Sequence, residues 1–346
     1  MNKLSVLIIF VLIVVGVGTF FVLGESTFAV AQLDYEGYRE DVILNRNNSF
    51  ETEDVIVTLK SDYGYGLRVR YVRPKLSRYP AKRFPAVFRI SGGWGTGLFL
   101  LDAEAARKAA AKGLIVAAYE SSIKKRYPLG SSKRDYNGFK DQDDAAVVLG
   151  SIFNNLQVDP NMVGVWSNSN GITIASGFLG REKYKELSKK VVFLLDAEGP
   201  HNPEYILKNT DDIDFRDEKR MISSWKKVIN AKVGPGKDYS TEEEFFKERC
   251  AINFIGNFKG IYRRGQARND HALTSYHGHA VAMLNAAAQG KARWARLNRE
   301  PKNQIYWSSQ EPDGVDIDSV IDVKQFKGPN DKRFWDVLFK LFNQLY

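Results

Sequence analysis

The sequence predicts an α/β fold: a mostly parallel sheet flanked by helices, with a helical insertion after the sixth strand. Two patterns support this prediction. From Pro85 onward, short apolar segments typical of buried strands alternate with segments of helical periodicity, as in chains whose parallel strands are joined by crossover helices. Charged, helix-prone sequence interrupts this alternation over residues 199–257, and the alternation then resumes.

The N-terminal segment indicates export. Leu4–Leu23 is apolar and uncharged, and its length matches the ~20 residues that span a bilayer as a helix. Ala29-Val30-Ala31 offers the small-residue pattern of a signal-peptide cleavage site. We therefore expect residues 1–31 to be a signal peptide or an N-terminal membrane anchor. The remaining domain, 32–346, would be secreted, or tethered and in contact with the membrane only through that segment.

The composition is that of an ordinary globular chain. Hydrophobic residues make up 44% and charged residues 26% of the 346 positions. The net charge of +9 is spread along the chain without a polybasic block, so we expect no nucleic-acid partner. The single cysteine, Cys250, cannot form an intramolecular disulfide, so the fold must be held together by its core.

The expected elements begin with a hairpin of two β-rich segments, Val55–Leu59 and Leu67–Val72, around a turn rich in Gly and Tyr. The following strands are expected at Ala86–Ile90, Leu114–Tyr119, Val163–Trp166, Val191–Leu195, Gly260–Arg264 and Gln304–Trp307. Helices are expected at Asp102–Lys112, Asp141–Leu156, the stretch ending at Leu179, Asp217–Val228, Thr241–Arg249 and His279–Ala288. A last helix carries an apolar stripe from Phe334 to Leu345, which we expect to dock on the sheet.

The stretch VGVWSNSNGITIA, Val163 to Ala175, predicts a sharp turn between a strand and a helix. Such a turn exposes one side chain at the carboxyl edge of the sheet and requires small residues two positions before and two after it. Ser167 and Gly171 satisfy this requirement around Ser169, whereas Val165 is too bulky for a turn centred on Ser167. If either serine is a nucleophile, it is Ser169.

With these motifs in this order, the chain resembles the α/β-hydrolase family, especially its dienelactone-hydrolase-like and prolyl-oligopeptidase-like members, over roughly residues 55–346. Arg89-Ile90-Ser91-Gly92-Gly93-Trp94-Gly95, Val158-Asp159-Pro160-Asn161 and the serine turn carry the resemblance, although the turn reads SxSxG rather than the usual GxSxG. The resemblance implies that the backbone N–H of Gly93 or Trp94 and that of Asn170 form an oxyanion hole.

The catalytic triad is incomplete by the family pattern. The family histidine follows the last strand, but this chain has no histidine after His279. Asp270 stands where the family acid is expected. Three arrangements remain open: His271 as base, paired with Asp196 or Glu198; His277 or His279 as base, with Asp270 orienting it; or a serine without a normal base. We favour His271 or His279. The alternative without a catalytic role is that His277-Gly278-His279 only caps a helix.

No cofactor or metal ion is expected. The spacing of Asp270, His271, His277 and His279 matches no established zinc motif. Residues 92–97 lack the glycine spacing of nucleotide-binding loops.

The function expected is that of an exported serine hydrolase cleaving a carboxylic ester, or less readily a peptide or amide, through an acyl-enzyme on Ser169. Residues 199–257 would form a lid over the site. The alternative hypotheses are a non-catalytic binding protein on the same fold, favoured by the missing terminal histidine, and a basic surface-adhesion module.

Overall fold

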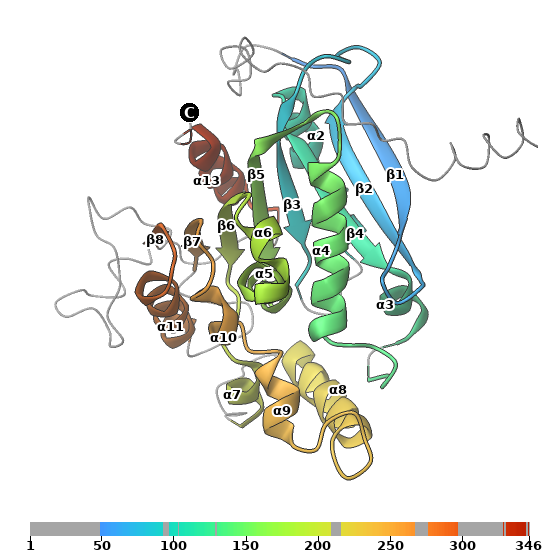
Figure 1. Cartoon of the computed structure of the whole chain (residues 1–346), viewed down its shortest axis with the longest axis vertical. Helices are drawn as coiled ribbons and strands as arrows, with labels where there is room; N and C mark the ends of the chain where they lie inside the picture. Colours follow the sequence, from blue (N-terminus) through green and yellow to red (C-terminus); the bar gives the residue numbers. More distant parts are fainter. Residues whose placement is uncertain are drawn as a thin grey trace, which may run out of the picture. The chain divides into compact units, whose positions relative to one another are not determined.

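The computed structural model describes residues 49–92, 97–102, 104–128, 130–208, 216–266, 276–296, 328, 330–343 and 345. The strands within these ranges are β1 (Thr52–Lys60), β2 (Gly66–Pro74), β3 (Phe84–Ile90), β4 (Ile115–Ser121), β5 (Val158–Asn168), β6 (Val191–Ala197), β7 (Ile261–Gly265) and β8 (Trp294–Arg296). They form one sheet in the order β1-β2-β4-β3-β5-β6-β7-β8 (Figure 1). β2 runs antiparallel to β1 and β4, and the other neighbours pair in parallel.

The described helices follow the predicted alternation with the strands. They are η1 (Leu98–Leu101), α2 (Glu104–Ala111), α3 (Ser122–Arg126), α4 (Phe139–Phe153), α5 (Gly171–Gly180), η2 (Glu182–Tyr184), α6 (Lys185–Ser188), α7 (Pro203–Lys208), α8 (Arg216–Lys232), α9 (Glu242–Lys247), α10 (Ile252–Ile255), α11 (Tyr276–Gln289) and α13 (Lys332–Asn343). The predicted α/β class, its initial hairpin and its mostly parallel sheet are confirmed.

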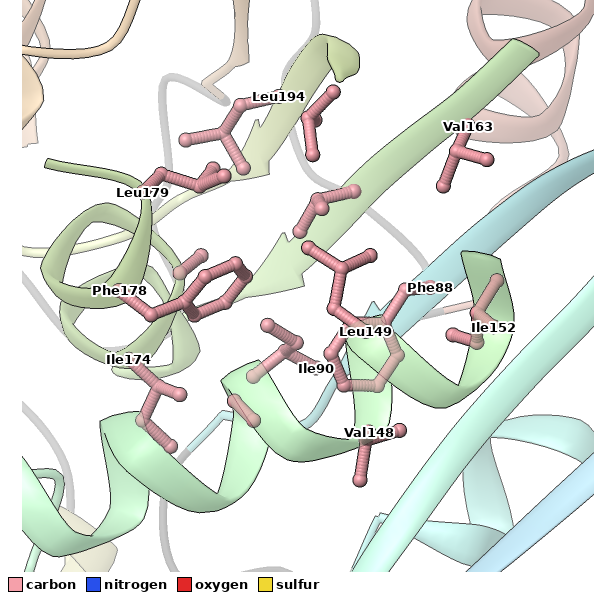
Figure 2. Close-up of a cluster of buried hydrophobic side chains, with 14 of the residues drawn as sticks. Phe88, Ile90, Val148, Leu149, Ile152, Val163, Ile174, Phe178, Leu179 and Leu194 are labelled. Atoms are coloured by element: carbon pink, nitrogen blue, oxygen red, sulfur yellow. The ribbon is translucent and has the colours of Figure 1, made fainter. Parts of the chain in front are cut away.

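One face of the sheet is covered by α4, α5 and α11. The apolar residues of α4 recur every three or four positions, so Leu149 and Ile152 pack toward the strands, and no residue of α4 after Lys140 is fully exposed. Figure 2 shows these side chains meeting Phe88 of β3, with Phe178 of α5 and Leu194 of β6 beside them. All five side chains are fully buried.

The other face is covered by α2 and α13. The expected docking of the last helix is confirmed: Trp335 meets Trp166 of β5 edge to face, with ring centroids 5.0 Å apart, and Phe342 meets Phe193 of β6 at 4.9 Å. A buried cation lies in the same layer. The Arg89 guanidinium stacks over Trp166 at 3.9 Å and donates to the Leu100 carbonyl at 2.9 Å. Burial lowers the pKa of Arg89 to about 9.

The predicted helical insertion lies between β6 and β7, where α7, α8, α9 and α10 occur. Figure 1 shows α7, α8 and α9 together beyond the arrowheads of β5 and β6. These helices have an apolar cluster of their own, which includes Trp225, Val228, Phe245 and Phe246. The insertion therefore packs as a small layer at the carboxyl edge of the sheet.

A further strand, β8, occurs where the sequence predicted none. β8 is a short edge strand at Trp294–Arg296, paired only with β7 among the described residues, in a basic stretch without a strand-like apolar run. The predicted strand Gln304–Trp307 and the N-terminal segment 1–31 lie outside the described residues. No helix in the described ranges is long and apolar enough to cross a membrane.

The hairpin is joined to α4 by hydroxyl groups. Ser61 Oγ and Tyr65 Oη donate hydrogen bonds to the two oxygens of the Asp144 carboxylate, at 2.6 and 2.5 Å. Asp144 is fully buried, and this burial raises its pKa to about 7, although the two hydroxyl groups act to lower it.

Replacing Trp335 with Ala is expected to lower the free energy of unfolding by about 3–5 kcal/mol, because it leaves a cavity against Trp166. Asp336→Ala, at the exposed next position of α13, is the matched control and is expected to change stability by about 0.5 kcal/mol or less. Both values are measured by urea unfolding. Equal midpoints for the two variants would show that α13 is not docked.

Asp144→Asn is expected to change the pH dependence of stability. The Asp144 carboxyl group holds its proton to a higher pH in the folded state than in the unfolded state. Its contribution to stability is therefore complete below pH ~4 and declines as the pH rises to ~7. The difference in unfolding free energy, wild type minus variant, should fall between pH 4 and 8 by on the order of 1–3 kcal/mol. A difference that is constant or rises with pH would contradict the raised pKa.

Candidate active site

Ser169 lies in the sharp turn that joins β5 to α5. Its backbone is in the left-handed region, with φ of 49°, a conformation that costs a residue with a Cβ roughly 1–3 kcal/mol. The Ser169 N–H donates to the Ala197 carbonyl at the end of β6 (2.7 Å), and the Ser169 carbonyl accepts from the Ile172 N–H (3.0 Å). Ser169 is half-buried. The strained turn thus places a hydroxyl group at the carboxyl edge of the sheet.

Two glycines allow this turn to pack against the end of β3. A Cβ on Gly171 would lie 2.7 Å from the Ser91 carbonyl oxygen, and a Cβ on Gly92 would lie 2.6 Å from Cβ of Ser169. Neither position could carry a larger residue without moving backbone. The small residue that the sequence pattern requires at position 171 is therefore a steric necessity, and Gly92 adds a second one.

The first small position of the turn is occupied by Ser167, where the family pattern has glycine. Ser167 is fully buried on β5, between Ile90 of β3 and Asp196 of β6 in the sheet. Its Oγ has no hydrogen-bond partner among the described residues. The serine is accommodated sterically, and its hydroxyl is too buried to react.

Asn170 begins α5. Its carbonyl accepts hydrogen bonds from the Asn137 side-chain amide at 3.0 Å and from the Thr173 N–H at 3.2 Å. The residue that follows Ser169 is thereby fixed at the N-terminal end of a helix, where backbone N–H groups favour negative charge. The other predicted oxyanion donors, Gly93 and Trp94, lie outside the described residues.

Asp196, the second-last residue of β6, forms a buried ion pair with Arg264 of β7. The Arg264 guanidinium donates to the Asp196 carboxylate at 2.6 Å, and the Tyr262 hydroxyl and the Gly199 N–H donate at 2.6 and 3.1 Å. Burial raises the pKa of Asp196, and the Arg264 charge opposes that shift. These donors make Asp196 a structural counter-ion that joins two strands and the loop after β6.

Glu198, the other alternative acid, lies two residues further along the same loop. It is buried, and its backbone is left-handed, with φ of 54°. Its N–H donates to the Gly265 carbonyl at the end of β7, at 2.9 Å. A strained, buried carboxylate thus lies at the edge of the sheet that also carries Ser169.

His279 is buried in the first turn of α11 and packs against His201, with ring centroids 4.3 Å apart. Tyr205 of α7 meets the His279 ring edge to face at 5.6 Å. Burial lowers the pKa of His279 to about 2 and that of His201 to about 4. Both rings are therefore neutral at physiological pH. His201 was not a sequence candidate, although its place four residues after β6 puts it at this edge.

Two contacts of His279 Nδ1 bear on the tautomer of its ring. The backbone N–H of His201 donates to His279 Nδ1 at 3.3 Å, and the ring atom Nδ1 of His201 contacts the same atom. The bond from the His201 backbone N–H favours a lone pair on Nδ1 and the proton on Nε2, whereas the contact between the two Nδ1 atoms lets either ring be the donor. Nε2 is buried and has no partner among the described residues.

The fold therefore brings Ser169, Asn170, Asp196 and Glu198 to one edge of the sheet. The start of α11, which carries His279, follows β7 at that edge. Asp270, His271 and the side chain of His277 lie outside the described residues. Within the described ranges, no group of three His, Cys, Asp or Glu side chains is placed to hold a metal ion.

Comparisons with known proteins identify the fold. No family model matches the chain, and no curated protein matches its sequence. Among solved structures, the Pyrobaculum calidifontis esterase is 14% identical, with 86% of each chain covered and a TM-score of 0.55. Acetyl xylan esterase 1 from Thermoanaerobacterium sp. JW/SL YS485 is 16% identical, with a TM-score of 0.51 over 85% of this chain and 84% of the esterase. Porphyromonas gingivalis dipeptidyl peptidase 4 is 13% identical, with a TM-score of 0.52 over 85% of this chain and 35% of the peptidase.

The likeness to these structures agrees with the geometry described above. The mostly parallel sheet, the antiparallel β1–β2 hairpin and the flanking helices are those the resemblance implied. The chain therefore has the α/β-hydrolase fold.

Proposed function

We propose that this protein is a serine hydrolase in which Ser169 attacks the carbonyl carbon of a carboxylic ester. The observation that carries the proposal is the left-handed turn at Ser169, at the carboxyl edge of the sheet. The turn packs closely against the end of β3 because Gly92 and Gly171 have no side chains. Strain of this kind persists where it serves a function. Two of the structures above are esterases that align with this chain over most of their length, which favours an ester over a peptide or amide.

The reaction has two halves. A histidine takes the Ser169 proton as Oγ bonds to the carbonyl carbon, and the N–H groups of Asn170 and of Gly93 or Trp94 stabilise the oxyanion. The same histidine returns the proton to the leaving alcohol, which leaves an acyl group on Ser169. Water then releases the acid by the reverse proton transfers.

We propose His271 as the base. A triad base donates Nδ1–H to a carboxylate and accepts the serine proton on Nε2. For His279, the hydrogen bond from the His201 backbone N–H to Nδ1 favours the opposite tautomer. Its pKa of about 2 also makes it a weak base.

The acid proposed for His271 is Glu198, which is buried in the loop after β6 at the edge of the sheet that carries Ser169. Asp196 is the weaker choice, because Arg264, Tyr262 and the Gly199 N–H hold it in a structural role. Asp270 is the alternative carboxylate, if His279 or His277 serves as the base.

A non-catalytic binding protein on the same fold is the second candidate. It is favoured by the absence of a histidine after His279 in the sequence, because the family histidine follows the last strand. We further propose that the protein acts outside the cytoplasm, secreted or tethered through residues 1–31, and that the insertion between β6 and β7 forms the lid that selects the substrate.

A fluorophosphonate probe should label the wild-type protein and lose that labelling in Ser169→Ala, with ester hydrolysis falling at least about 1,000-fold. Ser167→Ala is the matched control, since it removes a hydroxyl that is fully buried two residues away, and it should label like the wild type. Folded wild-type protein that takes up no probe and cleaves no short acyl ester would favour the binding protein.

The histidine assignment is tested by kcat/KM on p-nitrophenyl acetate. His271→Ala is expected to lose at least about 1,000-fold in kcat/KM, and His279→Ala less than about 10-fold, with a lower unfolding midpoint because a packed ring is lost. Glu198→Gln is also expected to lower kcat/KM. The assignment is wrong if His279→Ala abolishes turnover and His271→Ala keeps it.

A further inference from the structure

The segment before α4 contains two consecutive left-handed residues that are not glycine. Tyr136 has φ of 57° and Asn137 has φ of 68°, and both are buried. Left-handed backbone is uncommon for an aromatic residue and persists only where the surroundings impose it. The segment therefore has contacts strong enough to hold it in this form.

The insertion supplies those contacts from one side. Arg249 donates to the Asp135 carbonyl at 2.8 Å and pairs with its carboxylate at 3.4 Å. The Tyr136 ring packs within the apolar cluster of the insertion, 5.8 Å from the Trp225 ring. Asp135 and Tyr136 thus attach the segment to α8 and to the residues that follow α9.

The core holds Asn137 from the other side. Its N–H donates to the Asp141 carboxylate at 2.7 Å, and its carbonyl accepts from the Gln142 amide at 3.2 Å. Gln142 Nε2 also donates to the Glu248 carbonyl at 2.7 Å. Both backbone groups of Asn137 are therefore engaged within the first turns of α4 and beside the insertion.

These bonds leave the Asn137 side chain directed at the serine turn. Its Nδ2 donates to the carbonyl of Asn170 at 3.0 Å, in the residue next to Ser169. A hydrogen bond on that carbonyl fixes the peptide unit between residues 170 and 171, and this unit restrains the Asn170 N–H through the two backbone dihedral angles of Asn170. The left-handed backbone at Asn137 is what brings its short side chain to this carbonyl.

We propose that Asn137 is a positioning residue that fixes the Asn170 N–H for the oxyanion and connects the insertion to the serine turn. This inference rests on the proposed function. Oxyanion donors act only when they are held in place before charge develops. Asn137 therefore affects the turnover step while leaving the binding of the uncharged ester as it is.

The experiment compares Asn137→Gly, Asn137→Asp and the wild type on p-nitrophenyl acetate, with the rate of fluorophosphonate labelling and the urea midpoint measured in parallel. Glycine removes the amide and adopts φ of 68° without strain, so the folded state is retained. Aspartate keeps the shape and the tolerance for left-handed backbone but presents an oxygen to the Asn170 carbonyl. Asn154→Gly, at the exposed C-terminal end of α4, is the control.

The expected result for Asn137→Gly is a kcat about 10–100-fold lower with KM unchanged, slower probe labelling and no loss in the urea midpoint. For Asn137→Asp, activity relative to wild type should recover as the pH falls, because a protonated carboxyl can donate to the Asn170 carbonyl. Asp135, Asp141 and Glu248 nearby raise the pKa of the introduced group, and Arg249 opposes them.

Two outcomes overturn the inference separately from the proposed function. The first is that wild type and Asn137→Gly have the same kcat and labelling rate, or that Asn137→Gly changes KM and stability without lowering kcat. In that case Asn137 does not position the turn, and the proposed hydrolase function is unaffected. Wild-type protein that reacts with neither the ester nor the probe overturns both.

Discussion

The close approach of the turn after β5 to the end of β3 is the constraint on which the candidate site depends. Gly92 and Gly171 bring the Ser91–Gly92 backbone against the turn, and no larger residue fits at either position. Ser169 is thereby held at φ of 49°, with its N–H bonded to the end of β6. A buried sheet packed on both faces supplies the stability that offsets this strain.

Buried charges organise the loops around that turn. The ion pair of Arg264 with Asp196 fixes the loop after β6, from which Glu198 and His201 extend. Arg249 joins the insertion to the segment before α4 through Asp135. Each of these carboxylates and guanidinium groups is buried, so removing one partner would leave an uncompensated charge in the interior. The edge of the sheet is therefore built on polar contacts, whereas the layers beneath it are apolar.

The strand and helix order could be predicted from the sequence because apolar periodicity records which side of each element is buried. The apolar stripe of α13 and the apolar spacing of α4 each predict which side of the helix is buried. The turn at Ser169 was also predictable, since its steric rule involves only residues 167 and 171. β8 was not predicted because a three-residue edge strand in a basic stretch has no apolar pattern.

The side-chain contacts within the candidate site could not be predicted from the sequence, because they join residues far apart in the chain. Nothing in the sequence indicates that Asn137 reaches Asn170 or that His201 packs on His279. The roles of Asp196 and His279 likewise depend on their partners rather than on their positions. Composition and spacing identified which residue types gather at the sheet edge, but only the tertiary contacts distinguish structural groups from candidate catalytic ones.

The most direct test of the central claim is the mass of the protein trapped by acid during turnover of p-nitrophenyl acetate. A serine hydrolase with Ser169 as nucleophile predicts one added acetyl group, located on the proteolytic peptide that contains Ser169 and absent after prolonged incubation without substrate. An unmodified Ser169 peptide throughout turnover, with acetyl groups only on lysines, would contradict it.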